Sequence, residues 1–333
     1  MRDGFAELSP GDQANMARRA TVYEGVKKAC EFSGLRRQRF ELQTRGDSVP
    51  SGTKRLYLLR HGEGEHNVWR ATEQRAGRTP TAKRHNHGQF PAALHDPLLT
   101  VKGRDEATSA AAVACKLPRP DLLVTSPLRR ATETCLTAFA DAVSAGVPVV
   151  AHELCRESFH GTDPSIYDSR LSRDKLAVAY PHVDFTSHVL APSEAFDDPL
   201  WWQCASPFGL CGPHGVDEAA IAESAYQFLL WLMARPEDTI AVASHANFLL
   251  ALYHGCLDGV PATPQVFHTG ELRAVTVSVR WSPDVYGGAP GTSQGVHGMF
   301  RGRLSGCDCL LVEPALTIPP TPSTLDATAT ERH

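Results

Sequence analysis

Long apolar runs are missing from this sequence, and their absence excludes several classes of protein. It has no stretch of about 20 consecutive apolar residues, so it predicts no transmembrane helix. The first ten residues, MRDGFAELSP, include an acidic residue and no apolar run, so we expect no secretory signal. The net charge of −4 and the lack of long lysine or arginine runs give no general attraction for nucleic acid.

Cysteine spacing excludes a further set of sites. The nine cysteines form no CxxC pair, so they offer no zinc-binding pattern. Their odd number and irregular spacing favour free thiols in a reducing cytosol, and we expect a cytoplasmic protein. His85, His87 and His95 lack carboxylate or cysteine partners at metal-ligand spacing, so we interpret them as loop residues. We therefore expect neither a metal nor another cofactor.

Strand patterns alternate with helix patterns along most of the chain, which has 333 residues, 42% of them hydrophobic. Strands are predicted at residues 55–59 and 122–125, within 146–158, and at 239–245 and 272–279. Helices are predicted at residues 15–32, 99–117, 217–235 and 246–257. This alternation predicts an α/β fold with three α/β/α layers and a mostly parallel central sheet.

The predicted domain organisation has three parts. Residues 1–50 form a partly helical N-terminal extension that ends in a polar linker, and residues 51–282 form the main domain. Within that domain, residues 69–97 are expected to be a long loop, and residues 160–215 an insertion over the carboxyl ends of the strands. Residues 283–333 are rich in glycine and proline, and we expect the end of this segment to be disordered.

Ionisable residues follow three of the predicted strands. The first strand ends in Arg60 and His61, the second leads to Arg130, and another ends in His245. In a parallel sheet these strand ends share one edge, where ligands bind. Two arginines and two histidines would repel one another unless an anion lay between them, and arginine binds phosphate well. The pattern therefore predicts a phosphate site.

A histidine beside bound phosphate can also react with it. Neutral imidazole is a nucleophile, so His61 can accept a phosphoryl group if its other ring nitrogen is held by an acceptor. Glu157, after a further strand, is the candidate acid that protonates the leaving oxygen. Arg60, Arg130 and His245 are the candidates for stabilising charge on the transferring oxygens.

Five segments in chain order resemble the motifs of the histidine phosphatase superfamily, also called the phosphoglycerate mutase-like superfamily. These are RHGE at 60–63, HDPLLTVKG at 95–103, SPLRRA at 126–131, LCRE at 154–157 and SH at 244–245. The resemblance covers residues 55–280 and is closer to an uncharacterised plant and fungal branch, through RHGEGEHNV, YPHVDF, DDPLWW and RPEDTIAVASH. It implies the superfamily fold, phosphatase rather than mutase activity, and a phosphate-positioning role for Asn67.

The chain also departs from the family pattern. Ala246 stands where a glycine usually follows the second histidine, and Asp105 and Glu106 stand where a glutamine is common. The mutase continuation Ser-x-x-Asn is absent, because Gly64, Glu65 and His66 precede Asn67. These differences concern the surroundings of the motifs more than the predicted chemistry.

Several residues keep a second interpretation at this point. Arg129 competes with Arg130 for phosphate, and Glu157 could pair with Arg156 instead of acting as an acid. Asn67 could be only a turn or cap residue. Trp201 and Trp202 are interpreted as core of the insertion, with a substrate platform as the alternative. Arg170 is interpreted as an exposed residue, with a contact to an anionic group of the substrate as the alternative.

The sequence thus favours a metal-independent phosphomonoesterase that acts on a small phosphorylated metabolite through a phosphohistidine. A phosphoglycerate-type mutase is the first alternative, and a non-catalytic phospholigand-binding or scaffold protein is the second. We expect no nucleic-acid partner and no membrane partner. Neither the substrate nor the oligomeric state is indicated by any motif.

Overall fold

The computed structural model describes residues 10–32, 38–43, 52–78, 92–157, 165–191 and 218–281. Contacts divide the chain into one unit over residues 1–290 and another over residues 291–333, and all described residues belong to the first. The predictions for residues 283–333 lie outside the described residues.

Seven described strands form one mixed sheet in the order β4-β3-β5-β2-β7-β1-β6. The strands are β1 (Gln38–Gln43), β2 (Thr53–Arg60), β3 (Leu122–Thr125), β4 (Val149–Ala151), β5 (Thr239–Ser244), β6 (Leu257–Asp258) and β7 (Leu272–Trp281). Only β7 among them runs against its neighbours β2 and β1, while the other pairings are parallel. The predicted mostly parallel sheet is therefore confirmed.

The central strands bury side chains on both faces of the sheet. In β2, Leu56 and Leu58 belong to one hydrophobic cluster, and Tyr57 and Leu59 to another. In β5, alternate residues divide between the same two clusters. Because successive side chains of a strand point to opposite faces, the two clusters are the two interfaces of a three-layer structure.

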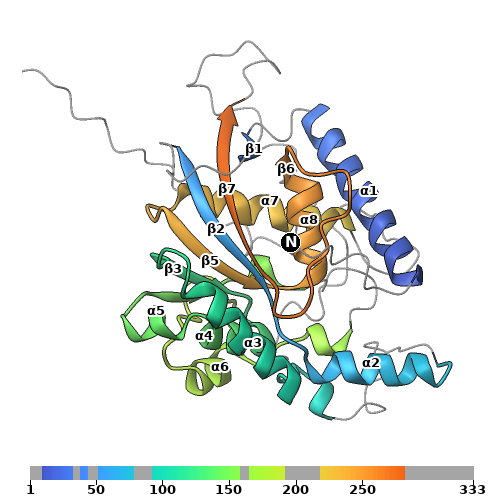
Figure 1. The fold of residues 1–333 in the computed structure, drawn as a ribbon, viewed down its shortest axis with the longest axis vertical. Helices are drawn as coiled ribbons and strands as arrows, with labels where there is room; N and C mark the ends of the chain where they lie inside the picture. The colour runs from blue at the N-terminus through green and yellow to red at the C-terminus, as the bar shows by residue number, and fades with distance from the viewer. Residues whose placement is uncertain are drawn as a thin grey trace, which may run out of the picture. The chain divides into compact units, whose positions relative to one another are not determined.

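Helices cover both faces, as Figure 1 shows. The described helices are α1 (Pro10–Phe32), α2 (Glu65–Arg75), α3 (Val101–Ala114), α4 (Arg129–Ala138), α5 (Ala140–Ser144), α6 (Arg173–Ala179), α7 (Glu218–Ala234) and α8 (Ala246–Cys256). Helices α1, α7 and α8 pack together in the first cluster, and α3 to α6 contribute to the second. The predicted α/β/α architecture is confirmed.

The N-terminal region is more closely integrated than its composition predicted. The expected linker contains β1, which pairs with both β7 and β6. Phe40 of β1 is buried and packs edge-on against Tyr226, with ring centroids 5.7 Å apart. The linker interpretation is wrong at Gln38–Gln43, because the flanking polar residues concealed a short alternating strand pattern.

Helix α1 also supports the helix that follows His245. The buried Tyr23 hydroxyl donates a hydrogen bond to Asn247 Oδ1 at 2.6 Å, and Asn247 lies in the first turn of α8. Residues 10–32 therefore stabilise one wall of the predicted site. They do not form a separate appendage.

Replacing Tyr23 with phenylalanine should lower the free energy of unfolding by about 1–3 kcal/mol, because it removes one partner of a buried hydrogen bond. Urea denaturation measures this change. Thr21→Ala, on the exposed side of the same helix, is the matched control and should change stability by less than about 0.5 kcal/mol. Equal stability of Tyr23→Phe and the wild type would contradict a supporting role for this contact.

Two predicted irregular segments contain regular structure. The expected loop at 69–97 overlaps α2, and the described part of the expected insertion at 160–215 contains α6 and a bridge between Val150 and Asp184. Short 3-10 helices lie at Ala92–Leu94, Glu153–Cys155 and Ile166–Asp168. Trp201 and Trp202 lie outside the described residues.

Each helix in the described part of the chain is too short or too polar to cross a lipid bilayer. The five cysteines in these segments form no disulfide with one another: Cys30, Cys115, Cys135, Cys155 and Cys256. These segments also hold no group of three metal-ligating side chains in suitable geometry.

Candidate active site

The carboxyl ends of β2 and β5 bring His61 and His245 together. Arg60 is paired with Ser244 in the parallel ladder, and the His61 N–H donates to the Ser244 carbonyl at 2.9 Å. The two imidazole centroids lie 5.0 Å apart. The prediction that these strand ends share one edge is confirmed.

A backbone contact fixes the orientation of the His61 ring. Nδ1 lies 2.6 Å from the Gly62 carbonyl oxygen, which can only accept a hydrogen bond. Nδ1 therefore carries the ring proton, and Nε2 carries the lone pair. This is the tautomer that a nucleophilic histidine requires.

Arg130 reaches the same place from the first turn of α4. Its side chain is fully buried, with one terminal nitrogen donating to the Tyr167 carbonyl at 2.6 Å and the other to Asp168 Oδ1 at 2.8 Å. Its Nε has no partner among the described residues, and the same is true of the Arg60 Nε. The charges of both arginines act on His61. We call Arg60, His61, Arg130 and His245 the cage.

Ser126 holds the His245 ring. Ser126 Oγ lies 2.8 Å from His245 Nε2 and also accepts a hydrogen bond from the Leu128 N–H. His245 Nδ1 is buried and has no partner in the described structure. The free ring nitrogen is therefore Nδ1, so Ser126 orients the ring.

Two carboxylates accompany the cage. Burial raises the pKa of Asp168 to about 6, the Arg130 charge opposes that rise, and Glu157 adds to it. Glu157 also acts electrostatically on Arg60. Arg156 forms an ion pair with Glu153 at 3.1 Å.

The loop after His61 is fixed by close contact with α3. A Cβ atom on Gly62 would lie 2.2 Å from the Gly103 carbonyl oxygen, and one on Gly103 would lie 2.1 Å from the Glu63 carbonyl oxygen. Glu106 accepts hydrogen bonds from the Glu63 N–H and from Thr269 Oγ1. Both glycines are therefore needed for backbone packing, and the carboxylate at 106 secures the loop.

Part of this chain, including three of the predicted site residues, matches a known protein family. A family model described as histidine phosphatase superfamily (branch 1) matches residues 56–166. Residues 56–166 belong to this superfamily. The resemblance inferred from the motifs is confirmed, and the match includes the histidine phosphatase segments that carry His61, Arg130 and Glu157.

Two curated relatives come from Arabidopsis thaliana. A "Phosphoglycerate mutase-like protein" is 28% identical over 229 residues, covering 61% of this chain and 73% of its own. A "Phosphoglycerate mutase-like protein 1" is 27% identical over 221 residues, covering 59% and 69%. With the family match, these names support a phosphatase or mutase activity.

Solved structures give weaker likenesses. A putative alpha-ribazole-5'-P phosphatase from Escherichia coli is 20% identical, with a TM-score of 0.40, covering 68% of this chain and 95% of its own. A mycobacterial glucosyl-3-phosphoglycerate phosphatase is 22% identical, with a TM-score of 0.33, covering 60% and 79%. At these scores the likenesses do not decide the activity.

Gly103 offers a test of how the loop after His61 is held. Gly103→Ala should lower the free energy of unfolding by about 1–3 kcal/mol, because the new methyl group overpacks against Glu63. A shift of the loop should also lower kcat by about a hundredfold. Gly25→Ala in α1 is the control: its Cβ meets nothing within 4 Å, so stability should rise slightly and activity stay unchanged. Normal activity in Gly103→Ala would contradict the packing argument.

Burial keeps His61, His245 and the neighbouring His66 neutral. It is the largest cause of the pKa values of His61, His245 and His66 lying well below the usual 6.5, and the Arg130 charge adds to each shift. Unfolded histidines bind protons near pH 6.5, so the unfolded state binds more protons below that pH. Stability is then fully present above pH 6.5 and falls as the pH decreases.

Urea denaturation between pH 7 and pH 5 should show this loss. Each buried histidine contributes up to about 1.4 kcal/mol per pH unit, because it must charge on unfolding. Asp168, with its raised pKa, opposes the trend, but three rings outweigh one carboxyl. His66→Phe should reduce the dependence of the unfolding free energy on pH by about the contribution of one buried histidine. A stability that stays constant or rises on acidification would contradict the burial of these rings.

The structure also decides several residue alternatives. Asn67 Oδ1 accepts a hydrogen bond from the Gly64 N–H at 2.9 Å, so Asn67 does cap the start of α2. Arg129 donates to the Asp96 carbonyl, while Arg130 lies in the cage. Arg170 is buried against Glu153, and its prediction as an exposed residue is wrong.

Two residues near the cage were missed as site residues. His66, five residues after His61, is buried with its ring centroid 5.7 Å from that of His61. Asp168 is the buried partner of Arg130. The signal available for His66 was its place beside the RHG segment. The Asp168 pairing had no signal in sequence spacing, because it lies 38 positions from Arg130.

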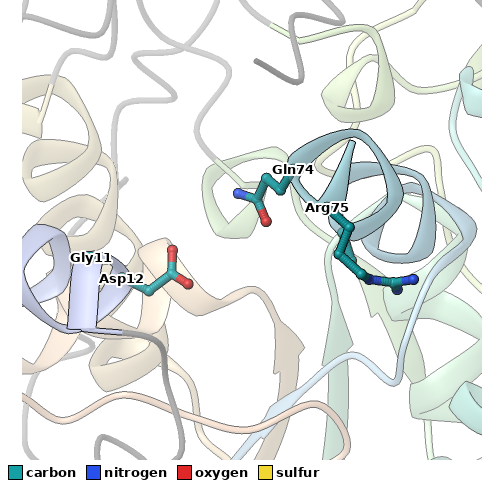
Figure 2. Close-up of a pocket in the computed structure, with 5 residues that line it drawn as sticks. Gly11, Asp12, Gln74 and Arg75 are labelled. Atoms are coloured by element: carbon teal, nitrogen blue, oxygen red, sulfur yellow. The ribbon is translucent and has the colours of Figure 1, made fainter. Parts of the chain in front are cut away.

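A separate surface pocket of about 570 Å³ lies between the start of α1 and the end of α2. Figure 2 shows the side chains of Asp12 and Gln74 pointing toward one another from the two helices, with Arg75 next to Gln74. Helix α2 begins at the cage and ends at this pocket, a span of roughly 15 Å. None of the predicted site residues lines it, so we assign the chemistry to the cage.

Proposed function

We propose that this protein is a metal-independent phosphomonoesterase that hydrolyses a small phosphorylated metabolite through a phosphohistidine at His61. The activity is proposed for the cytoplasm, with no nucleic-acid or membrane partner.

One observation carries this proposal: buried nitrogens around His61 have no hydrogen-bond partner in the described structure. They are the Nε atoms of Arg60 and Arg130 and the Nδ1 atom of His245. Buried polar groups in native proteins are nearly always paired, so an unpaired set implies a ligand. Two of these nitrogens are guanidinium donors, which suit an oxyanion. A phosphoryl group meets all of these requirements.

The first step is attack on phosphorus. His61 Nε2 forms the P–N bond while the ester P–O bond breaks, and the Gly62 carbonyl holds the Nδ1 proton throughout. Glu157 donates a proton to the departing oxygen, so the alcohol leaves neutral. Arg60, Arg130 and His245 stabilise the negative oxygens of the transferring group. Asn67 adds its amide NH₂ group, since its Oδ1 is held by Gly64.

The second step returns the enzyme to its starting state. Glu157, now a carboxylate, takes a proton from water, and the water oxygen attacks phosphorus. The P–N bond breaks, inorganic phosphate forms, and His61 recovers its lone pair. Side chains supply the positive charge that stabilises the phosphoryl oxygens in both steps, which supports a reaction without a metal ion.

A mutase is the second candidate, because both curated relatives are called phosphoglycerate mutase-like. A mutase would return the phosphoryl group to another oxygen of the same substrate, and it must exclude water while doing so. Interchange of 2- and 3-phosphoglycerate is its direct assay. Rapid interchange with little release of phosphate would favour the mutase.

The proposal is tested with a panel of phosphate esters in the presence of EDTA. We expect inorganic phosphate release in EDTA and, on rapid quenching of a radiolabelled ester reaction, an acid-labile label on histidine. Turnover only after a divalent metal is added would contradict it. Phosphate binding by calorimetry without turnover of any ester would indicate a phospholigand-binding protein.

A further inference from the structure

His66 is the one buried side chain of α2 among the residues described in that helix. His66 lies in the first turn of α2, and only 4% of the residue is exposed to solvent. Most of α2 faces solvent; Val68, for example, is 43% exposed. The pattern of exposed residues along α2 does not explain why this one imidazole is buried.

The buried ring lies against the cage. Its centroid is 5.7 Å from that of His61, and it stacks on Tyr167 at 5.1 Å. The Tyr167 carbonyl is the group that holds Arg130. His66 therefore belongs to the same cluster of rings and guanidinium groups, although it follows no strand.

Gly64 explains how the ring fits. A Cβ atom at position 64 would lie 2.7 Å from His66 Nδ1 and 3.4 Å from Arg130 Cδ. Glycine is therefore the residue that lets the ring reach the cage. Nδ1 is buried against Gly64 and has no hydrogen-bond partner in the described segments.

This packing decides which nitrogen can meet a ligand. The Cα of Gly64 offers no acceptor for a proton on Nδ1, so the neutral ring carries its proton on Nε2. Burial, together with the charges of Arg130 and His61, holds the pKa of His66 well below its usual value. The ring therefore stays neutral and presents an N–H group.

We propose that His66 is a third imidazole of the phosphate site and donates a hydrogen bond from Nε2 to an oxygen of the phosphoryl group. This inference rests on the proposed function and deepens it. His66 keeps its proton through both steps, so it changes no bond. A neutral donor stabilises the transferring oxygens without adding repulsion among the cations of the cage.

Two substitutions separate hydrogen bonding from packing. His66→Phe keeps a flat ring against Tyr167 but has no N–H, whereas His66→Gln loses the ring and places an amide NH₂ near the Nε2 position. With p-nitrophenyl phosphate we expect His66→Phe to lower kcat by about a hundredfold. His66→Gln should retain most of the wild-type rate. Calorimetry with inorganic phosphate should show the same order, with about tenfold weaker binding in His66→Phe.

A matched control and an indirect variant complete the test. Val68→Ala, two residues along α2 on its exposed side, should match the wild type in rate and binding. Gly64→Ala should lower the rate as His66→Phe does, because its methyl group displaces the ring. Urea denaturation of each variant shows whether it is folded.

The outcomes distinguish this inference from the proposed function. If the wild type hydrolyses esters and His66→Phe is equally active, the inference fails alone. An active His66→Phe with an inactive His66→Gln also overturns it, because that order indicates packing. If the wild type hydrolyses nothing, the proposed function fails, and phosphate calorimetry on the two variants still tests the hydrogen bond.

Discussion

Replacing His61 with alanine should lower kcat for p-nitrophenyl phosphate by at least about a thousandfold, because the residual rate then comes only from the other three residues of the cage. The acid-labile label should disappear as well. No other described ring combines a held Nδ1 proton with the charges of Arg60 and Arg130 and a ring centroid 5.0 Å from that of His245. A neighbouring histidine is therefore not expected to replace it as the nucleophile.

His182→Ala is the control for this substitution, because His182 is exposed and is not part of the cage. Its rate and its labelling should match those of the wild type. Steady-state kinetics in EDTA and an acid quench measure both quantities. Equal rates for His61→Ala and His182→Ala would contradict the phosphohistidine mechanism.

Removing Arg130 should have the second largest effect, because it damages both activity and stability. Arg130→Met keeps a long apolar stem but leaves the buried Asp168 without its 2.8 Å partner. Breaking a buried ion pair in this way typically costs about 3–5 kcal/mol. The loss of a guanidinium from the transferring oxygens should lower kcat by about a thousandfold.

The stability loss in Arg130→Met should depend on pH. Burial already raises the pKa of Asp168 to about 6 with Arg130 present, and the pKa rises further when that positive charge is gone. A protonated carboxyl is tolerated in the interior, whereas a carboxylate is not. The folded state of Arg130→Met therefore loses stability as the pH rises, and the deficit should be larger at pH 8 than at pH 5.

A double variant separates the two roles of Arg130. Arg130→Met with Asp168→Asn removes the unpaired charge, so urea denaturation at pH 8 should show most of the stability restored. The rate should stay as low as in Arg130→Met, since the guanidinium is still missing. Recovery of activity in the double variant would indicate that Arg130 only balances Asp168. Full stability of Arg130→Met would contradict the buried pair.

Sequence patterns could predict the cage because its members follow regular strands. Parallel strands place their carboxyl ends at one edge, so His61 and His245 were expected to meet once β2 and β5 were recognised. Threonine is a typical N-cap residue, and Thr100 before α3 does accept a hydrogen bond from the Gly103 N–H through its side chain. These features depend on local pattern and on one general rule of sheet geometry.

Other elements depend on contacts between distant residues. Strand β1 is short and polar in composition, and it is recognisable only through its pairing with β7 and β6. Helix α2 exposes most of its surface and so lacks a strong apolar period. Contacts with distant parts of the chain stabilise β1 and α2, and the local sequence pattern does not predict such contacts.

The partners of the cage residues were the hardest to predict. Asp168 reaches Arg130 from a segment that was expected to be irregular, and sequence distance gave no reason to pair them. His66 depends on the missing side chain of Gly64, since the ring occupies the space that a Cβ atom would fill. Both depend on the packing of side chains in three dimensions.

The position of β7 has a consequence for synthesis of the chain. β7 is the last described strand to leave the ribosome, yet it lies between β2 and β1 in the sheet. Until it emerges, β1 has only the short β6 to pair with, and β2 has one open edge. Such long-range pairing slows folding and leaves strand edges exposed. We therefore expect chaperones to protect these strand edges of the nascent chain until Trp281 has left the ribosome.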